Sequence, residues 1–223
     1  MSDHNFIFSR PLAGRFVLLA MTSLGILTST ILPMYAANIP AATVTKPQTA
    51  VFAGGCFWGV EAVFEHLKGV SEVVSGYSGG KPETAQYRTV SAGETGHAES
   101  VRVIYDPSKI SYPQLLKIYF LVAHDPTQLN RQGPDFGTQY RSAIFYVNDE
   151  QKKAAQAYII QLNKQHLFQQ PIVTKLAPLN KFYQAEKYHQ DFIAHHPYNP
   201  YVVFNDLPKL SQLQKKFPDL YKQ

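Results

Sequence analysis

Cysteine is the scarcest reactive residue in this chain of 223 residues, because it occurs once, at Cys56. A single cysteine excludes an intramolecular disulfide, and it also excludes a zinc site built from cysteines alone. An unpaired thiol in an exported protein is open to oxidation unless the protein uses or protects it. The lack of a second thiol therefore raises the question of what Cys56 itself does.

Charged side chains are also few, at 17% of residues, whereas hydrophobic residues make up 45%. This balance predicts a folded chain, and the length suits one well-buried domain rather than two. The formal net charge is only +5. The C-terminal lysines alternate with apolar and acidic residues and predict a solvated helix face, so no nucleic-acid partner is expected; they are Lys209, Lys215, Lys216 and Lys222.

The N-terminus carries an apolar run over residues 16–32 that follows Arg15 and ends in small residues. This pattern is typical of a secretory signal peptide, here residues 1–37, with cleavage after Ala36 or Ala37. An uncleaved membrane anchor is the alternative, although the run is slightly short of the roughly 20 residues of a full span. Both alternatives predict secretion across the inner membrane and a folded part in the periplasm.

The remaining chain divides into a linker (38–46), a folded domain (47–200) and a C-terminal extension (201–223) of open role. Apolar patterns predict strands at 49–53, 70–74, 98–105, 142–147 and 172–176, and helices at 58–67, 111–120, 149–165 (capped by Asp149) and 183–195. The interleaving predicts a single α+β domain, with a mixed sheet and helices packed against it. A long loop over 124–137 is rich in glycine and proline, and such loops are usually functional.

Cys56 follows Gly54-Gly55 and precedes Phe57-Trp58, at the turn from a strand into a helix. The N–H groups and dipole of a helix start favour the thiolate, so we expect the pKa of Cys56 to lie below its usual value. The glycines would let another molecule approach the backbone, and one or both aromatic rings would line a pocket beside the sulfur. The alternatives are a buried structural cysteine and ordinary aromatic packing.

Glu99 opens a predicted strand two residues after His97. A carboxyl group beside an aromatic pocket has its pKa raised by desolvation, which would make Glu99 a proton donor. The alternative is a strand residue that faces solvent. His97 is either a base for Cys56 or a structural hydrogen-bonding group.

Other polar candidates are the phenols of Tyr87 and Tyr140 and the carboxylate of Asp135. Asp135 and Tyr140 belong to one segment and would reach a site together. Late in the chain, His195 and His196 are neighbours whose rings point apart on a helix, so no metal site is predicted there.

Four segments, taken together and in order, resemble the A-type peptide methionine sulfoxide reductases. They are Gly55–Gly59, Gly76–Gly80, Gly96–Glu99 and Gly137–Ser142, and the resemblance covers roughly residues 51–200. Several separate motifs in the right order are far more specific than any one of them.

The resemblance implies a ferredoxin-like α/β sandwich and a role for each candidate. Cys56 would attack the sulfoxide sulfur, and Glu99 would protonate the sulfoxide oxygen. The other family positions would be two phenols that bind this oxygen, a site carboxylate, and two walls around the methyl group: Tyr87, Tyr140, Asp135, Phe57 and Trp58. A polarised S=O bond needs such an acid, a thiolate and an apolar slot.

The resemblance also implies the substrates, which are the S epimer of methionine sulfoxide in oxidised proteins and as the free amino acid. It implies neither a metal nor an organic cofactor, and the chain is expected to act as a monomer. Many family members resolve the resulting sulfenic acid with a second cysteine, which this chain lacks. We therefore expect a thioredoxin-like external thiol to reduce Cys56 through a mixed disulfide.

Two other classes of function fit parts of the pattern. A cysteine-dependent hydrolase or transferase would use His97 as the base for Cys56. A non-catalytic module would use its aromatic residues to bind methionine-rich peptides. Incubation with methionine sulfoxide and no reductant separates the three, because the reductase alone would release methionine and leave a sulfenic acid on Cys56.

Overall fold

The computed structural model describes residues 46–223. The predicted leader over residues 1–37 lies outside the described residues, as does the predicted linker apart from Lys46. Among residues 46–223, no helix is long and apolar enough to cross a lipid bilayer.

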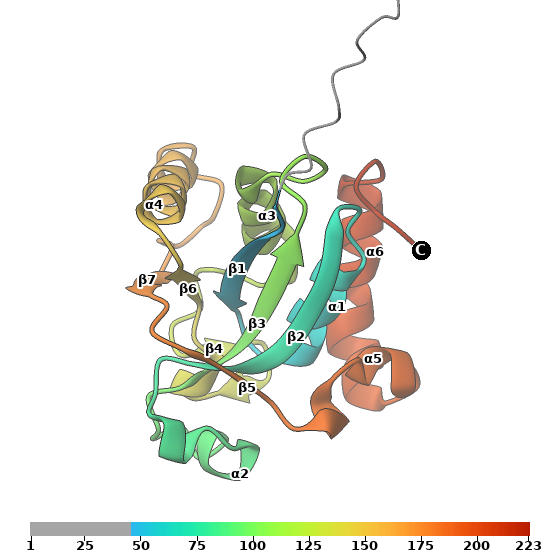
Figure 1. Cartoon of the computed structure of the whole chain (residues 1–223). Helices are drawn as coiled ribbons and strands as arrows, with labels where there is room; N and C mark the ends of the chain where they lie inside the picture. The colour runs from blue at the N-terminus through green and yellow to red at the C-terminus, as the bar shows by residue number, and fades with distance from the viewer. Residues whose placement is uncertain (1–45) are drawn as a thin grey trace, which may run out of the picture. The chain divides into compact units, whose positions relative to one another are not determined.

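A six-stranded sheet with the order β7-β6-β1-β3-β2-β8 forms the centre of the molecule (Figure 1). Its strands are β1 (Gln48–Ala53), β2 (Val70–Ser78), β3 (Ala98–Tyr105), β6 (Ala143–Tyr146), β7 (Lys175–Pro178) and β8 (Phe182–Gln184). All neighbours pair antiparallel except β6 and β7, which are parallel. The sheet is therefore mixed, as the sequence predicted.

The helices are α1 (Phe57–Glu65), α2 (Tyr87–Val90), α3 (Tyr112–Ile118), α4 (Asp149–Lys164), α5 (Phe192–His195) and α6 (Leu207–Lys216). Helices α1 and α3 lie behind the sheet in the view of Figure 1, and α6 lies beside α1. The chain order β1-α1-β2-β3-α3-β6, combined with the sheet order β6-β1-β3-β2, is the ferredoxin-like arrangement. This confirms the predicted fold class.

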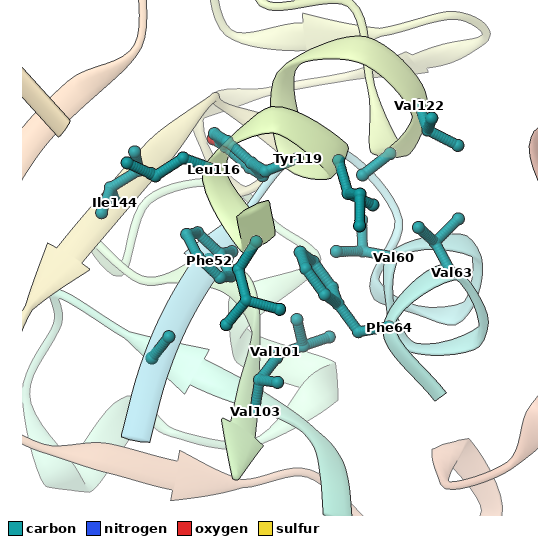
Figure 2. Close-up of a cluster of buried hydrophobic side chains, with 14 of the residues drawn as sticks. Phe52, Val60, Val63, Phe64, Val101, Val103, Leu116, Tyr119, Val122 and Ile144 are labelled. Atoms are coloured by element: carbon teal, nitrogen blue, oxygen red, sulfur yellow. The ribbon is translucent and has the colours of Figure 1, made fainter. Parts of the chain in front are cut away.

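The core lies between the sheet and the helices, and Figure 2 shows its centre. The ring of Phe52 on β1 stacks on Phe64 of α1, with centroids 5.0 Å apart, and on Tyr119, with centroids 4.9 Å apart. Val60 and Val63 of α1 are buried in the same core. Burial of each such side chain contributes about 1.5–3 kcal/mol, so this face fixes α1 and the residue at its start, Cys56.

Polar side chains cap helices α3 and α4. Ser111 and Gln114 form a capping box at the start of α3. Helix α4 is capped by Asn148, whose side chain accepts a hydrogen bond from the N–H of Gln151 at 2.8 Å. The predicted cap, Asp149, is instead the first residue of the helix.

The predicted helix over residues 183–195 is wrong. Residues Phe182–Gln184 form strand β8, a 3₁₀ turn follows at Lys187–His189, and only Phe192–His195 is α-helical. Strand β8 pairs with β2 at Gly76, where a side chain would come within 2.3 Å of the carbonyl oxygen of Tyr183. The absent side chain lets the two backbones meet. Strand β2 continues to Ser78, beyond the predicted strand end, because it pairs with both β3 and β8 there.

The C-terminal extension packs closely on the rest of the described chain. Helix α6 contacts α1, and Leu213 of α6 is fully buried. Near the chain end, the N–H of Lys68 donates to the carbonyl of Leu220 at 2.8 Å, and the N–H of Lys222 donates to the carbonyl of His66 at 2.9 Å. The extension therefore belongs to the same compact unit.

Candidate active site

One pocket of about 330 Å³ brings together the seven residues that the sequence singled out. Two further residues, from the segment after α5, also line it. The full set is Cys56, Phe57, Trp58, Tyr87, Glu99, Asp135, Tyr140, Asn199 and Tyr201. Because these residues come from six separate parts of the chain, the fold itself assembles the pocket.

Cys56 occupies the cap position of α1, directly after β1 and the two glycines. Gly55 has a φ of +92°, and a side chain there would lie 2.5 Å from Cγ of Gln132. A side chain at Gly54 would lie 2.8 Å from Cγ of His124. These glycines accommodate the protein's own loop, which corrects the expectation that they admit another molecule.

The sulfur of Cys56 reaches the pocket, although the residue is only 9% exposed. Burial raises the pKa of this thiol well above its ordinary value, and the carboxylates of Glu99 and Asp206 raise it further. The N–H of Trp58 and the ammonium group of Lys209 act in the opposite direction but more weakly. The helix start thus has the expected effect, but desolvation outweighs it, and the resting group is a thiol rather than a thiolate.

Glu99 lies on β3 and is 2% exposed, so it does not face solvent. Its Oε2 accepts a hydrogen bond from the N–H of Phe57 at 3.1 Å, which holds the carboxyl group beside the start of α1. Burial, with a contribution from Asp135, raises the pKa of Glu99 to about 8. The group therefore holds a proton at neutral pH and can donate it, as predicted.

His97 is a structural residue. Its Nδ1 accepts from the N–H of Gly80 at 3.2 Å, and its Nε2 lies 2.9 Å from the carbonyl oxygen of Lys81. A carbonyl accepts only, so Nε2 is the protonated nitrogen. Both ring nitrogens are engaged away from Cys56, which removes the base that a hydrolase would need.

Arg141 joins the two segments that carry Glu99 and Tyr140. Its guanidinium donates to the carbonyl of His97 at 3.0 Å and to that of Gly96 at 2.9 Å. These bonds fix the loop before Arg141 against the start of β3. They therefore hold Glu99 and Tyr140 in fixed positions relative to each other.

The phenols of Tyr87 and Tyr140 project into the pocket, and burial raises the pKa of both. Neither hydroxyl hydrogen-bonds to another protein group among residues 46–223. The Tyr87 backbone is fixed by a 2.9 Å bond from its N–H to Glu186, and its ring packs 4.4 Å from that of His189. The two phenols are thus proton donors available to a ligand.

The aromatic pair forms the apolar wall. Phe57 is buried, whereas Trp58 is half-buried and stacks on Phe192 with ring centroids 3.5 Å apart. The indole N–H of Trp58 donates to Nδ1 of His189 at 3.2 Å. Since both rings also line the pocket, the wall beside the sulfur is rigid.

Sequence reasoning missed Tyr201 and Asn199. The Tyr201 hydroxyl donates to Oδ2 of Asp135, and its ring meets that of Trp58 edge to face. The one local signal is an aromatic-rich stretch after residue 197, and 14 tyrosines in the chain make such a signal weak.

A family model described as peptide methionine sulfoxide reductase matches residues 48–221. The chain belongs to the peptide methionine sulfoxide reductase family. It is therefore an oxidoreductase that reduces methionine sulfoxide and serves protein repair. The match includes most of the segment after residue 200.

Curated relatives agree with this assignment. The reductase MsrA 2 of Mesorhizobium japonicum is 60% identical over 176 residues, which cover 79% of this chain and 90% of the relative. MsrA 2 of a Synechocystis strain is 52% identical over 190 residues, covering 85% of this chain and 89% of that relative.

Solved structures of the family share the fold of this reductase. Reduced Mxr1 from Saccharomyces cerevisiae is 33% identical with a TM-score of 0.64, and the match covers 69% of this chain and 88% of that one. Methionine sulfoxide reductase A of Corynebacterium diphtheriae is 34% identical with a TM-score of 0.60, covering 69% and 78%.

No cluster of three or more histidine, cysteine, aspartate or glutamate side chains suited to a metal ion occurs within the described part of the reductase. His195 and His196 are both exposed.

Proposed function

We propose that Cys56 and Glu99 reduce the S epimer of methionine sulfoxide, both in oxidised proteins and as the free amino acid. The observation that carries this proposal is the meeting of one thiol, one protonated carboxyl group and two uncommitted phenols in a single pocket. A sulfoxide needs an attacking sulfur on one side and proton donors at its oxygen on the other. The rings of Phe57 and Trp58 suit the methyl group.

The reaction begins with attack of the Cys56 sulfur on the sulfoxide sulfur. Glu99 passes its proton to the sulfoxide oxygen while Tyr87 and Tyr140 donate hydrogen bonds to it, and the proton of the thiol restores the acid. The S–O bond of the substrate then breaks and its oxygen is transferred to the Cys56 sulfur as the new sulfur–sulfur bond breaks, so methionine leaves and Cys56 becomes a sulfenic acid. Asp135, held by Tyr201, orients the substrate.

Recovery of the enzyme needs two thiols from outside the chain, because Cys56 is its single cysteine. The first displaces water from the sulfenic acid and forms a mixed disulfide. The second breaks that disulfide, so Cys56 leaves as a thiolate and the reductant becomes oxidised. A thioredoxin-like dithiol protein supplies both thiols in one partner.

The reductase acts as a periplasmic monomer. The basic and apolar pattern of residues 1–37 supports export across the inner membrane, with residues 16–32 as an alternative anchor. Cell fractionation of the full chain and of a form that starts at Pro47 tests this: export predicts that the shortened form stays in the cytoplasm.

Mass spectrometry of a single turnover tests the chemistry. With the S epimer and no reductant, the wild type should release one methionine per chain and gain one oxygen on Cys56. Cys56→Ser should release none, and Glu99→Gln should slow release by roughly 10²–10⁴-fold. Glu83→Gln, which alters an exposed carboxylate, is the matched control. Release by Cys56→Ser at the normal rate would contradict the proposal.

A further inference from the structure

The segment after residue 200 brings a buried ion pair to the start of α1. The Lys209 ammonium group lies 3.0 Å from Oδ1 of Asp206. The Asp206 side chain is fully buried and that of Lys209 is 17% exposed, so water screens the pair poorly. Lys209 therefore does not belong to the solvated lysine face that its sequence context predicted.

The pair lies against the first turn of α1. A Cβ atom at Gly59 would come within 2.1 Å of Oδ1 of Asp206 and within 2.6 Å of the Lys209 Nζ. Gly59 follows Cys56 by three residues, which is less than one helical turn. The two charges thus occupy the space that a side chain at Gly59 would fill, beside the first turn of the helix that Cys56 caps, and both act on the Cys56 thiol.

The pair is also incompletely satisfied. Oδ2 of Asp206 is buried and has no hydrogen-bond partner among the described residues. Buried carboxylates normally have partners for both oxygens, because desolvation of an ion costs several kcal/mol. A fold gains little stability from such a pair, which points to an electrostatic role.

We propose that Asp206 and Lys209 are positioning residues that set the protonation state of Cys56 through opposite charges. The carboxylate keeps the resting sulfur protonated and so protects the lone thiol from oxidation. The ammonium group stabilises the Cys56 thiolate at the moment when the mixed disulfide breaks and the sulfur receives the bonding electron pair. The second part rests on the proposed function of Cys56.

Other groups also act on this sulfur and must be held constant in a test. The carboxyl of Glu99 acts on the Cys56 thiol directly, and the phenols interact with its charge. These groups come from β3, α2, the turn before β6 and the segment after α5: Glu99, Tyr87, Tyr140 and Tyr201. None of them is altered by the variants below.

The pH dependence of Cys56 alkylation by iodoacetamide tests the proposal without any turnover, and the single cysteine makes the signal unambiguous. Asp206→Asn should shift the alkylation midpoint to lower pH and raise the rate at pH 7 roughly three- to tenfold. Adding Lys209→Met to Asp206→Asn should shift the midpoint back upward. Asp106→Asn with Lys109→Met, which alters a more exposed pair of the same spacing, should leave the alkylation midpoint unchanged.

An unchanged midpoint in Asp206→Asn, or a double variant whose midpoint does not rise above that of Asp206→Asn, would overturn the proposal. Thermal melting checks that each variant is folded. If Asp206→Asn does not fold, Lys209→Arg should keep the wild-type profile above pH 8 and Lys209→Met should raise its midpoint. If the alkylation shifts are absent while Cys56→Ser has no turnover, the positioning role alone is refuted. Turnover by Cys56→Ser would refute the proposed function.

Discussion

At the scale of single residues, burial decides how the pocket is charged. Both Cys56 and Glu99 hold their protons at neutral pH, because the cost of a buried charge exceeds the help from the helix start. In the resting pocket, both the Cys56 thiol and the Glu99 carboxyl group are therefore protonated and can donate a proton. The sulfur gains its nucleophilic character when a substrate arrives, rather than before.

The raised pKa of Glu99 makes a prediction about stability. Folded Glu99 keeps its proton up to about pH 8, whereas an unfolded carboxyl loses it near 4.5. Its stabilising contribution is full below the lower value and is lost as pH rises through the higher one. Urea unfolding should show wild type losing stability relative to Glu99→Gln between pH 5 and 8, by up to about 1.4 kcal/mol per pH unit.

Exposed Glu83 offers the control for this measurement, since Glu83→Gln should leave the pH dependence unchanged. Parallel curves for wild type and Glu99→Gln would mean that Glu99 is ionised in the folded protein. It would then be unable to serve as the acid at neutral pH.

The sequence located most of the pocket because its residues lie in short local motifs. Cys56 and Glu99 each stand beside glycines and aromatic residues that mark a turn into an element. Tyr201 escaped notice because its place depends on the chain folding back to Asp135, and no local pattern encodes that contact. The direction of the Cys56 pKa shift was wrong for a related reason, since desolvation depends on the whole surrounding fold.

At the scale of elements, the start of α1 is where the sheet, the loop after α3 and the C-terminal segment meet. Local patterns identified α1, β1 and β3 well, since each is a mostly apolar segment that is largely buried. It failed for residues 183–195, whose apolar spacing resembles a helix. Pairing with β2 at Gly76 and the left-handed backbone of Asp191, with a φ of +51°, prevent a continuous helix there.

Gly59→Ala should destabilise the protein even though alanine is the better helix former. The new methyl group would fall 2.1 Å from an oxygen of Asp206, so the ion pair or α1 has to move. Overpacking of this kind costs about 1–3 kcal/mol, which exceeds the gain of about 1 kcal/mol in helix propensity. Thermal unfolding measures the balance.

Gly133→Ala serves as the comparison, because its methyl group would meet nothing within 4 Å and only its left-handed φ of +54° opposes the change. A Gly59→Ala protein more stable than wild type would show that the space beside α1 is open.

At the scale of the whole molecule, the C-terminal segment closes the fold around α1. The backbone bonds to Leu220 and Lys222 and the bridge between Leu67 and Tyr221 tie the chain end to the turn after α1. Leu67 is fully buried. The extension thus supports the same helix whose start carries Cys56.

Removal of residues 218–223 should lower the unfolding free energy by about 3 kcal/mol, since it uncovers Leu67 and breaks the two backbone bonds to the turn after α1. A shorter deletion of Lys222 and Gln223 keeps the contacts of Tyr221 and should cost about 1 kcal/mol. Urea unfolding measures both. Equal stability of the two shortened forms would mean that Leu220 and Tyr221 contribute nothing.

The small volume of the pocket limits what can occupy it at one time. About 330 Å³, with Cys56 at its wall, has room for a methionine sulfoxide side chain or for the thiol of a reductant, but the same sulfur has to meet each. The methionine product must therefore leave before the electron donor enters. Initial rates at several donor concentrations should give parallel double-reciprocal lines. A large excess of either the sulfoxide or the electron donor should inhibit turnover, because it keeps the other reactant out of the pocket.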